Sequence, residues 1–155
     1  MTATFKAIGV TTLGYQPPGN AHGLAGVQHL HATVALPATA GLNDVIQFGY
    51  LPPNAVVTGV WLKAQSQLDS ATSLTFDMGV AGSATLWKSA ISTVGRAAGV
   101  SSDSTIATGG GLYKNTSGAK LLVQAVIHAA AGTPVAGVIE CSVSYFVEDA
   151  SGSQA

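Results

Sequence analysis

The sequence carries very little charge. Charged residues make up only 8% of its 155 residues, against about 25% in an ordinary soluble domain, and the formal net charge is −1. Disorder does not explain this deficit, because disordered chains are poor in apolar residues and 47% of this chain is hydrophobic. A monomer with so few charges would have little to oppose association. We therefore expect a folded subunit that hides much of its surface against copies of itself or a larger partner.

Other absences exclude whole classes of partner. The six Lys and Arg residues form no basic patch, so nucleic-acid binding is not expected. The N-terminus lacks the apolar run of a signal peptide. Residues 121–139 are weakly apolar, but Gln124, His128 and the Gly-Thr-Pro break at 132–134 favour two strands and a turn over a membrane helix. We expect a soluble protein made in a cytoplasm, with no membrane partner.

Alternation of apolar and polar residues with a period of two predicts strands in six segments: 27–36, 44–51, 55–64, 73–81, 119–131 and 134–148. Between them, Leu86, Ala90, Ile91 and Val94 form a stripe that predicts a helix of one or two turns within 86–98, and residues 99–118 read as a loop. The predicted fold is all-β, an antiparallel β-sandwich of jelly-roll type.

The pattern also predicts three parts of the chain. Residues 1–26 read as an extended N-terminal arm, with Phe5, Tyr15 and the pair Pro17 and Pro18 as anchors and a short strand near Phe5. Residues 27–148 form the β-sandwich, and residues 149–155 a flexible tail. An arm that orders on binding needs such anchors and a receiving surface, so we expect it to reach onto a neighbouring subunit or another protein surface.

Trp61 raises a question about the strand at 55–64. The natural core face of that strand holds Val56, Thr58, Val60, Leu62 and Ala64, which places Trp61 on the opposite face beside Lys63. Two interpretations stay open: Trp61 lies in a subunit interface, or the arm or a loop of the same chain covers it.

No constellation of catalytic residues is present, so we expect neither an enzyme nor a cofactor. His29 and His31 share one strand face and could ligate a metal with His22 or His128. No carboxylate or cysteine lies near them in sequence, so polar residues on a half-exposed face are the favoured interpretation, and no metal is expected. Cys141, the single cysteine, alternates with apolar residues and reads as a buried, inert thiol.

Two motifs resemble one family. Leu51-Pro52-Pro53-Asn54 leads into the strand VVTGVWLKAQ, and the later segment SLTFDMGVAGSATLW contains the step Asp77-Met78-Gly79. In a small, charge-poor β-protein with a loose N-terminus, this organisation resembles the capsid decoration (cement) proteins of tailed bacteriophages. The resemblance covers roughly residues 27–147.

The resemblance implies a function. It implies a structural virion protein, assembled in the host cytoplasm, that sits on the outer capsid surface as a homotrimer and clamps the major capsid protein. Phe5, Tyr15, Pro17, Pro18, His29, His31 and Trp61 are the candidate contact residues. The alternative from another class is a carbohydrate-binding, lectin-like head or tail fibre domain that stacks sugars on Trp61, Trp87 or Tyr113.

Overall fold

A computed structural model describes residues 2–6, 27–92, 94, 101–104 and 112–148. Its strands are β1 (Thr4–Lys6), β2 (Gln28–Leu36), β3 (Val45–Leu51), β4 (Ala55–Ala64), β5 (Thr75–Val80), β6 (Ser83–Ile91), β7 (Ser101–Ser104), β8 (Tyr113–Lys114), β9 (Leu121–Ala129) and β10 (Gly137–Val147). No helix occurs among these residues, so the predicted all-β class is confirmed. The same part of the chain accordingly offers no helix that could cross a membrane.

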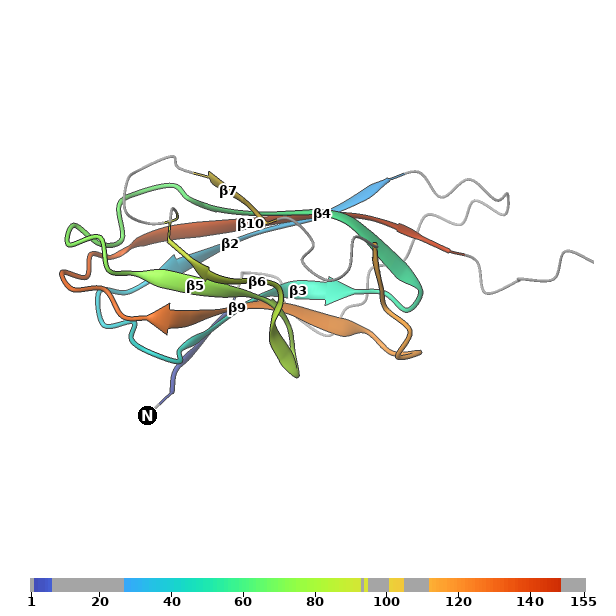
Figure 1. Cartoon of the computed structure of the whole chain (residues 1–155), viewed down its shortest axis with the longest axis horizontal. Coiled ribbons are helices and arrows are strands. Elements are labelled where there is room, and N and C mark those ends of the chain that lie inside the picture. Colours follow the sequence, from blue (N-terminus) through green and yellow to red (C-terminus); the bar gives the residue numbers. More distant parts are fainter. Residues whose placement is uncertain (1, 7–26, 93, 95–100, 105–111, 149–155) are drawn as a thin grey trace, which may run out of the picture.

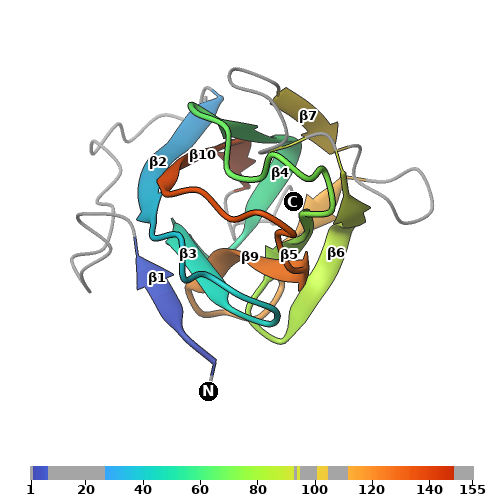
Figure 2. The ribbon, with the colours of Figure 1, turned by 90° about the vertical axis from the view of Figure 1, so that its left-hand side faces the viewer.

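The strands form two sheets that pack face to face (Figure 1). One sheet has the order β1-β3-β9-β5-β6, and the other has the order β2-β10-β4-β7, with β8 paired to β4. The chain changes sheet at every step except β5 to β6 and β7 to β8. That path is the double-sheet, jelly-roll arrangement. Seen end-on, the two sheets close around a single interior (Figure 2).

The interior is filled by the inward faces of both sheets. Its largest fully buried side chains are Trp87, Phe48, Phe76, Ile46, Leu51 and Leu62. In the strand predicted at 73–81, alternation places Leu74, Phe76, Met78 and Val80 on the inward face, and all four are buried. Cys141 lies in the same core, as expected. Burial, aided by the neighbouring carboxylate of Glu140, raises the pKa of the Cys141 thiol far above its ordinary value, so the thiol stays protonated.

The helix predicted within 86–98 is wrong over residues 86–91, which belong to strand β6. Irregular pairing between β5 and β6 interrupts the ladder in this segment. Ile91 of the predicted stripe is buried, whereas Ala90 beside it is exposed. Ala90 carries the irregularity with a φ of 52°. The predicted loop at 99–118 likewise contains the short strands β7 and β8.

Two further bulges change which residues face the core. In the strand predicted at 44–51, alternation places Ile46, Phe48 and Tyr50 on the inward face. The pairing of β3 with β9 skips Phe48, so Tyr50 is instead 37% exposed and Leu51 takes the core position. In β4 the pairing with β10 skips Thr58, which turns Thr58 outward and brings Val57 into the core. Beyond each bulge the expected alternation is shifted by one residue.

Asp69 fixes the loops at one end of the sandwich. Its carboxylate is fully buried and accepts hydrogen bonds from the backbone N–H groups of Ala71, Ser73, Leu74 and Thr133. Burial alone would raise the pKa of Asp69, but these N–H donors outweigh it and hold the pKa well below its ordinary value. The carboxylate therefore joins the β4–β5 loop to the β9–β10 loop.

Candidate interaction surface

Three of the predicted contact residues lie together on one face of the molecule. His29 and His31 on β2 and Trp61 on β4 point outward from the sheet β2-β10-β4-β7. Strand β10 lies between β2 and β4, and its Ser142 is the register partner of both His31 and Trp61. Neighbouring strands are about 4.8 Å apart, so His31 and Trp61 start about 10 Å apart across the row. We call this surface the Trp61 face.

Trp61 is the largest exposed group on that face. The bulge at Thr58 shifts only the residues that precede it in β4, so Trp61 keeps its predicted outward position. The residue is 39% exposed. The indole lies back along the strand over Gly59, where any Cβ atom would collide with the ring. One side of the indole is therefore supported by the backbone of its own strand, and the residue keeps 39% of its surface exposed.

Polar side chains surround Trp61 in the adjacent rows. Glu140 accepts a hydrogen bond from Gln65 Nε2 at 2.9 Å, and its other oxygen lies 3.9 Å from His31 Nδ1. His29 Nδ1 lies 3.0 Å from the hydroxyl of Ser144. The face combines one exposed aromatic ring, small serines and a few hydrogen-bonding groups with almost no net charge. This composition is typical of the aromatic-anchored contact region between proteins.

The remaining predicted contact residues lie elsewhere. Phe5 is on β1, where it is partly buried against the core of its own chain. Tyr15, Pro17 and Pro18 lie outside the described residues. The sequence places Gly59 and Glu140 on the outward sides of their strands, but sequence reasoning did not name either as a contact residue. Their outward positions follow from the alternation, but only the register of β10 with both β2 and β4 brings them beside His31 and Trp61.

The outer face of the other sheet carries a self-contained polar cluster. Asp77 on β5 accepts hydrogen bonds from the Ser89 hydroxyl at 2.8 Å and the Ala90 N–H at 2.9 Å. Its other oxygen lies 2.9 Å from His128 Nδ1. Burial opposes ionisation, but the Ala90 N–H, His128 and Ser89 lower the pKa of Asp77. Serine and histidine both contact the aspartate, so this cluster lacks the serine–histidine bond of an activated nucleophile.

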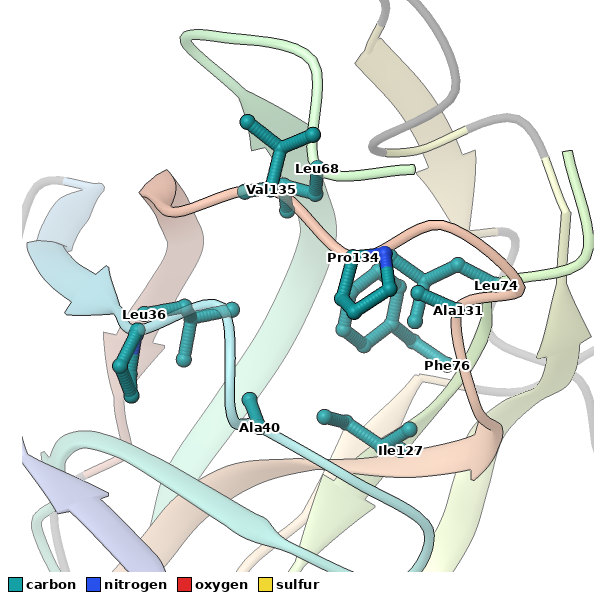
Figure 3. Close-up of a pocket in the computed structure, with 10 residues that line it drawn as sticks. Leu36, Ala40, Leu68, Leu74, Phe76, Ile127, Ala131, Pro134 and Val135 are labelled. Atoms are coloured by element: carbon teal, nitrogen blue, oxygen red, sulfur yellow. The ribbon is translucent and has the colours of Figure 1, made fainter. Parts of the chain in front are cut away.

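A small apolar pocket opens at the end of the sandwich where the β2–β3, β4–β5 and β9–β10 loops meet (Figure 3). Leu36, Ala40, Leu68, Phe76, Ile127 and Val135 are among its lining residues. Its volume is about 20 Å³, little more than one water molecule needs. A pocket of this size and lining offers no site for a cofactor or a sugar.

The aromatics named for sugar stacking separate into different environments. Trp87 is fully buried, which excludes it as a stacking surface, and its ring meets the half-buried Tyr113 edge-on at a centroid distance of 6.1 Å. Trp61 alone of the three is exposed. Within the part of the chain that the structure describes, no group of three or more His, Cys, Asp or Glu side chains is placed to hold a metal ion.

Comparison with known proteins gives two informative structural matches. A chain of the capsid asymmetric unit of cyanophage Pam1 is 29% identical, with a TM-score of 0.65, over 90% of this protein and 99% of that chain. A chain of the capsid of Ralstonia phage GP4 matches with a TM-score of 0.67 over 96% and 100% of the two chains, but at 20% identity it supports the fold alone. No protein-family model and no curated protein matches the sequence. The matches support a structural protein related to phage capsids.

Proposed function

We propose that this protein is a capsid decoration protein, a homotrimer that binds the outer surface of a phage capsid and stabilises the shell. The observation that carries the proposal is the match to the Pam1 capsid chain, because it spans nearly the whole of both chains. The likeness therefore includes both sheets of the sandwich, since it extends over 90% of this chain and 99% of that chain.

The surface chemistry suits such a role. A decoration protein has to stay folded in solution and then spread contacts over several capsid subunits. The buried core and the loops held by Asp69 supply a rigid body, while the Trp61 face offers an aromatic anchor with few charges to desolvate. Each bound copy adds its binding free energy to the assembled shell only, so many copies stabilise the particle collectively.

The major capsid protein is the partner that this proposal requires. We assign its contact to the Trp61 face, with Trp61, His29 and His31 as the residues that touch it. The N-terminal arm links neighbouring subunits. In this arrangement the Trp61 face contacts the joints between capsid subunits, and the arm contacts the neighbouring copy.

Capsids assembled without the protein provide the direct test. Purified protein is added, unbound protein is removed, and both the retained protein and the temperature of DNA release are measured. We expect saturable retention and a higher release temperature than for the bare particles. Retention without any change in release temperature would remove the stabilising role.

The lectin-like alternative is tested on the same preparation. A glycan array probed with the wild-type protein is expected to stay blank. Binding to glycans together with no retention on capsids would overturn the decoration function in favour of a carbohydrate-binding domain that uses Trp61.

A further inference from the structure

The strand β1 differs from every other strand in how it is attached. It pairs in parallel with β3, Thr4 with Val45 and Lys6 with Gln47, whereas all other pairings among the described strands are antiparallel. No hairpin enforces this pairing, because residues 7–27 separate β1 from β2 in sequence. The position of β1 is therefore set by its docking contacts alone (Figure 2).

The edge of β3 is built to receive a short strand. Asp44, which is itself buried, accepts a hydrogen bond from the Ala3 N–H at 2.6 Å and a second one from Gly41 N–H at 2.9 Å. The Val45 N–H donates to the Ala3 carbonyl at 2.9 Å. Phe5 places its ring against the core beside the edge. A carboxylate, a strand ladder and an aromatic contact together recognise residues 2–6.

The same contacts can be made by residues 2–6 of another copy. A segment that docks through a long connection gains identical interactions whether the acceptor is its own chain or a neighbour, and only the entropy of the connection differs. Twenty-one residues can extend over at most about 70 Å, about twice the length of an eleven-residue strand such as β10. A neighbouring subunit in contact with this one is within that reach.

We propose that β1 is exchanged in the oligomer, so that residues 2–6 of each subunit dock on the β3 edge of the next copy. This inference rests on the proposed homotrimer. Exchange in one direction around a threefold axis closes a ring in which every donor strand and every acceptor edge is occupied. The ring ties the three subunits together through backbone hydrogen bonds and needs none of the charged contacts that this sequence lacks.

A pair of cysteines at register partners distinguishes exchange from self-docking. In the double variant Lys6→Cys with Gln47→Cys, the two thiols lie on directly paired residues of adjacent strands, within reach of a disulfide. The native Cys141 is buried and does not interfere. After mild oxidation, exchange predicts covalent trimers of about three times the 15.4 kDa chain mass on a denaturing, non-reducing gel.

Each other outcome contradicts the proposal. Oxidised protein that runs as a disulfide-containing monomer shows that β1 docks on its own chain, and the absence of any disulfide shows that β1 does not occupy the β3 edge. The single variants serve as controls and are expected to stay monomeric on the gel. A circular dichroism spectrum matching the wild type establishes that the double variant is folded.

A second measurement uses the single variants together. When Lys6→Cys and Gln47→Cys chains are refolded as a mixture and oxidised, only exchange can join two different chains. Sedimentation of the wild-type protein separates this inference from the function on which it rests. A trimer in sedimentation with monomeric disulfides refutes the exchange and leaves the decoration function standing, whereas a monomer at all concentrations refutes the proposed homotrimer itself.

Discussion

The outer faces of the two sheets each hold a carboxylate in a central strand, and the two carboxylates have different surroundings. Asp77 is only 8% exposed, and its oxygens are engaged by Ser89, Ala90 and His128 of the same chain. Glu140 is half-buried, with one hydrogen bond from Gln65 and a longer approach to His31. Both oxygens of Asp77 are therefore engaged within the chain, whereas Glu140 can still accept a hydrogen bond from another molecule.

Backbone geometry explains the contrast. Strand β6 bends at Ala90, and this bend points the Ala90 N–H at the carboxylate of Asp77. Strands β2 and β10 instead pair without interruption over nine residues, so their outward side chains stand in regular rows. The bend at Ala90 thus satisfies the carboxylate of Asp77, whereas the regular β2–β10 ladder leaves Glu140 half-buried in its row. The comparison predicts that mutations on one face change stability and mutations on the other change binding.

The largest effect on stability is expected from Asp77→Ala. The substitution removes the acceptor for two donors and the partner of His128, and we expect it to lower the free energy of unfolding by about 2–4 kcal/mol in urea denaturation. Glu140→Ala is the matched control and should cost less than about 1 kcal/mol. Equal losses from the two variants would end the distinction between the faces.

The dependence of stability on pH is the next effect. The pKa values of Asp69 and Asp77 are lowered in the folded protein, so the stability that these carboxylates contribute is present above about pH 4, the unfolded value, and is lost as the pH falls. Urea denaturation should show a marked loss between about pH 5 and pH 3. Asp77→Asn should lose less over that interval, since one of the two groups no longer titrates. A wild-type stability that rises on acidification would contradict the assignment.

Binding should respond to Trp61→Ala and not to Tyr50→Ala. The two side chains are 39% and 37% exposed on the outer faces of opposite sheets, which makes Tyr50 a matched control. We expect Trp61→Ala to weaken retention on bare capsids about 30-fold, equivalent to about 2 kcal/mol, with stability changed by less than about 1 kcal/mol. A larger loss from Tyr50→Ala would move the contact surface to the other sheet.

A smaller effect is expected from Gly59→Ala. The added methyl group occupies the space under the indole, so the ring of Trp61 has to lift from the strand while β4 stays paired. Retention on capsids should fall severalfold, less than for Trp61→Ala, and the double variant should bind no worse than Trp61→Ala alone. Additive losses would show that Gly59 acts on binding by another route than the orientation of the ring.

Much of the fold follows from the period of two alone. The strand at 55–64 has the predicted bounds, and the inward residues of 73–81 are as expected, because burial on one face imposes strict alternation. Tyr50 and Thr58 were assigned to the wrong face for one shared reason. A bulge adds a residue at a position chosen by the partner strand, and the alternation within one strand carries no record of its partner.

The candidate surface was predictable only in part. Alternation in the sequence places His29, His31 and Trp61 on the outward faces of their strands. It also shows that the strand at 134–148 has one apolar face. One sequence does not reveal the long-range pairing of the strands. Only the structure shows that β10 lies between β2 and β4 and aligns Ser142 with His31 and Trp61. Gly59 could have been noticed, because a glycine two residues before an outward tryptophan leaves room for its ring.

Electron cryomicroscopy of capsids incubated with the protein tests the central claim most directly. We expect three jelly-roll densities around threefold positions of the outer surface, with the Trp61 face directed toward the major capsid protein. Particles with bare outer surfaces, or density confined to the tail, would contradict the decoration function.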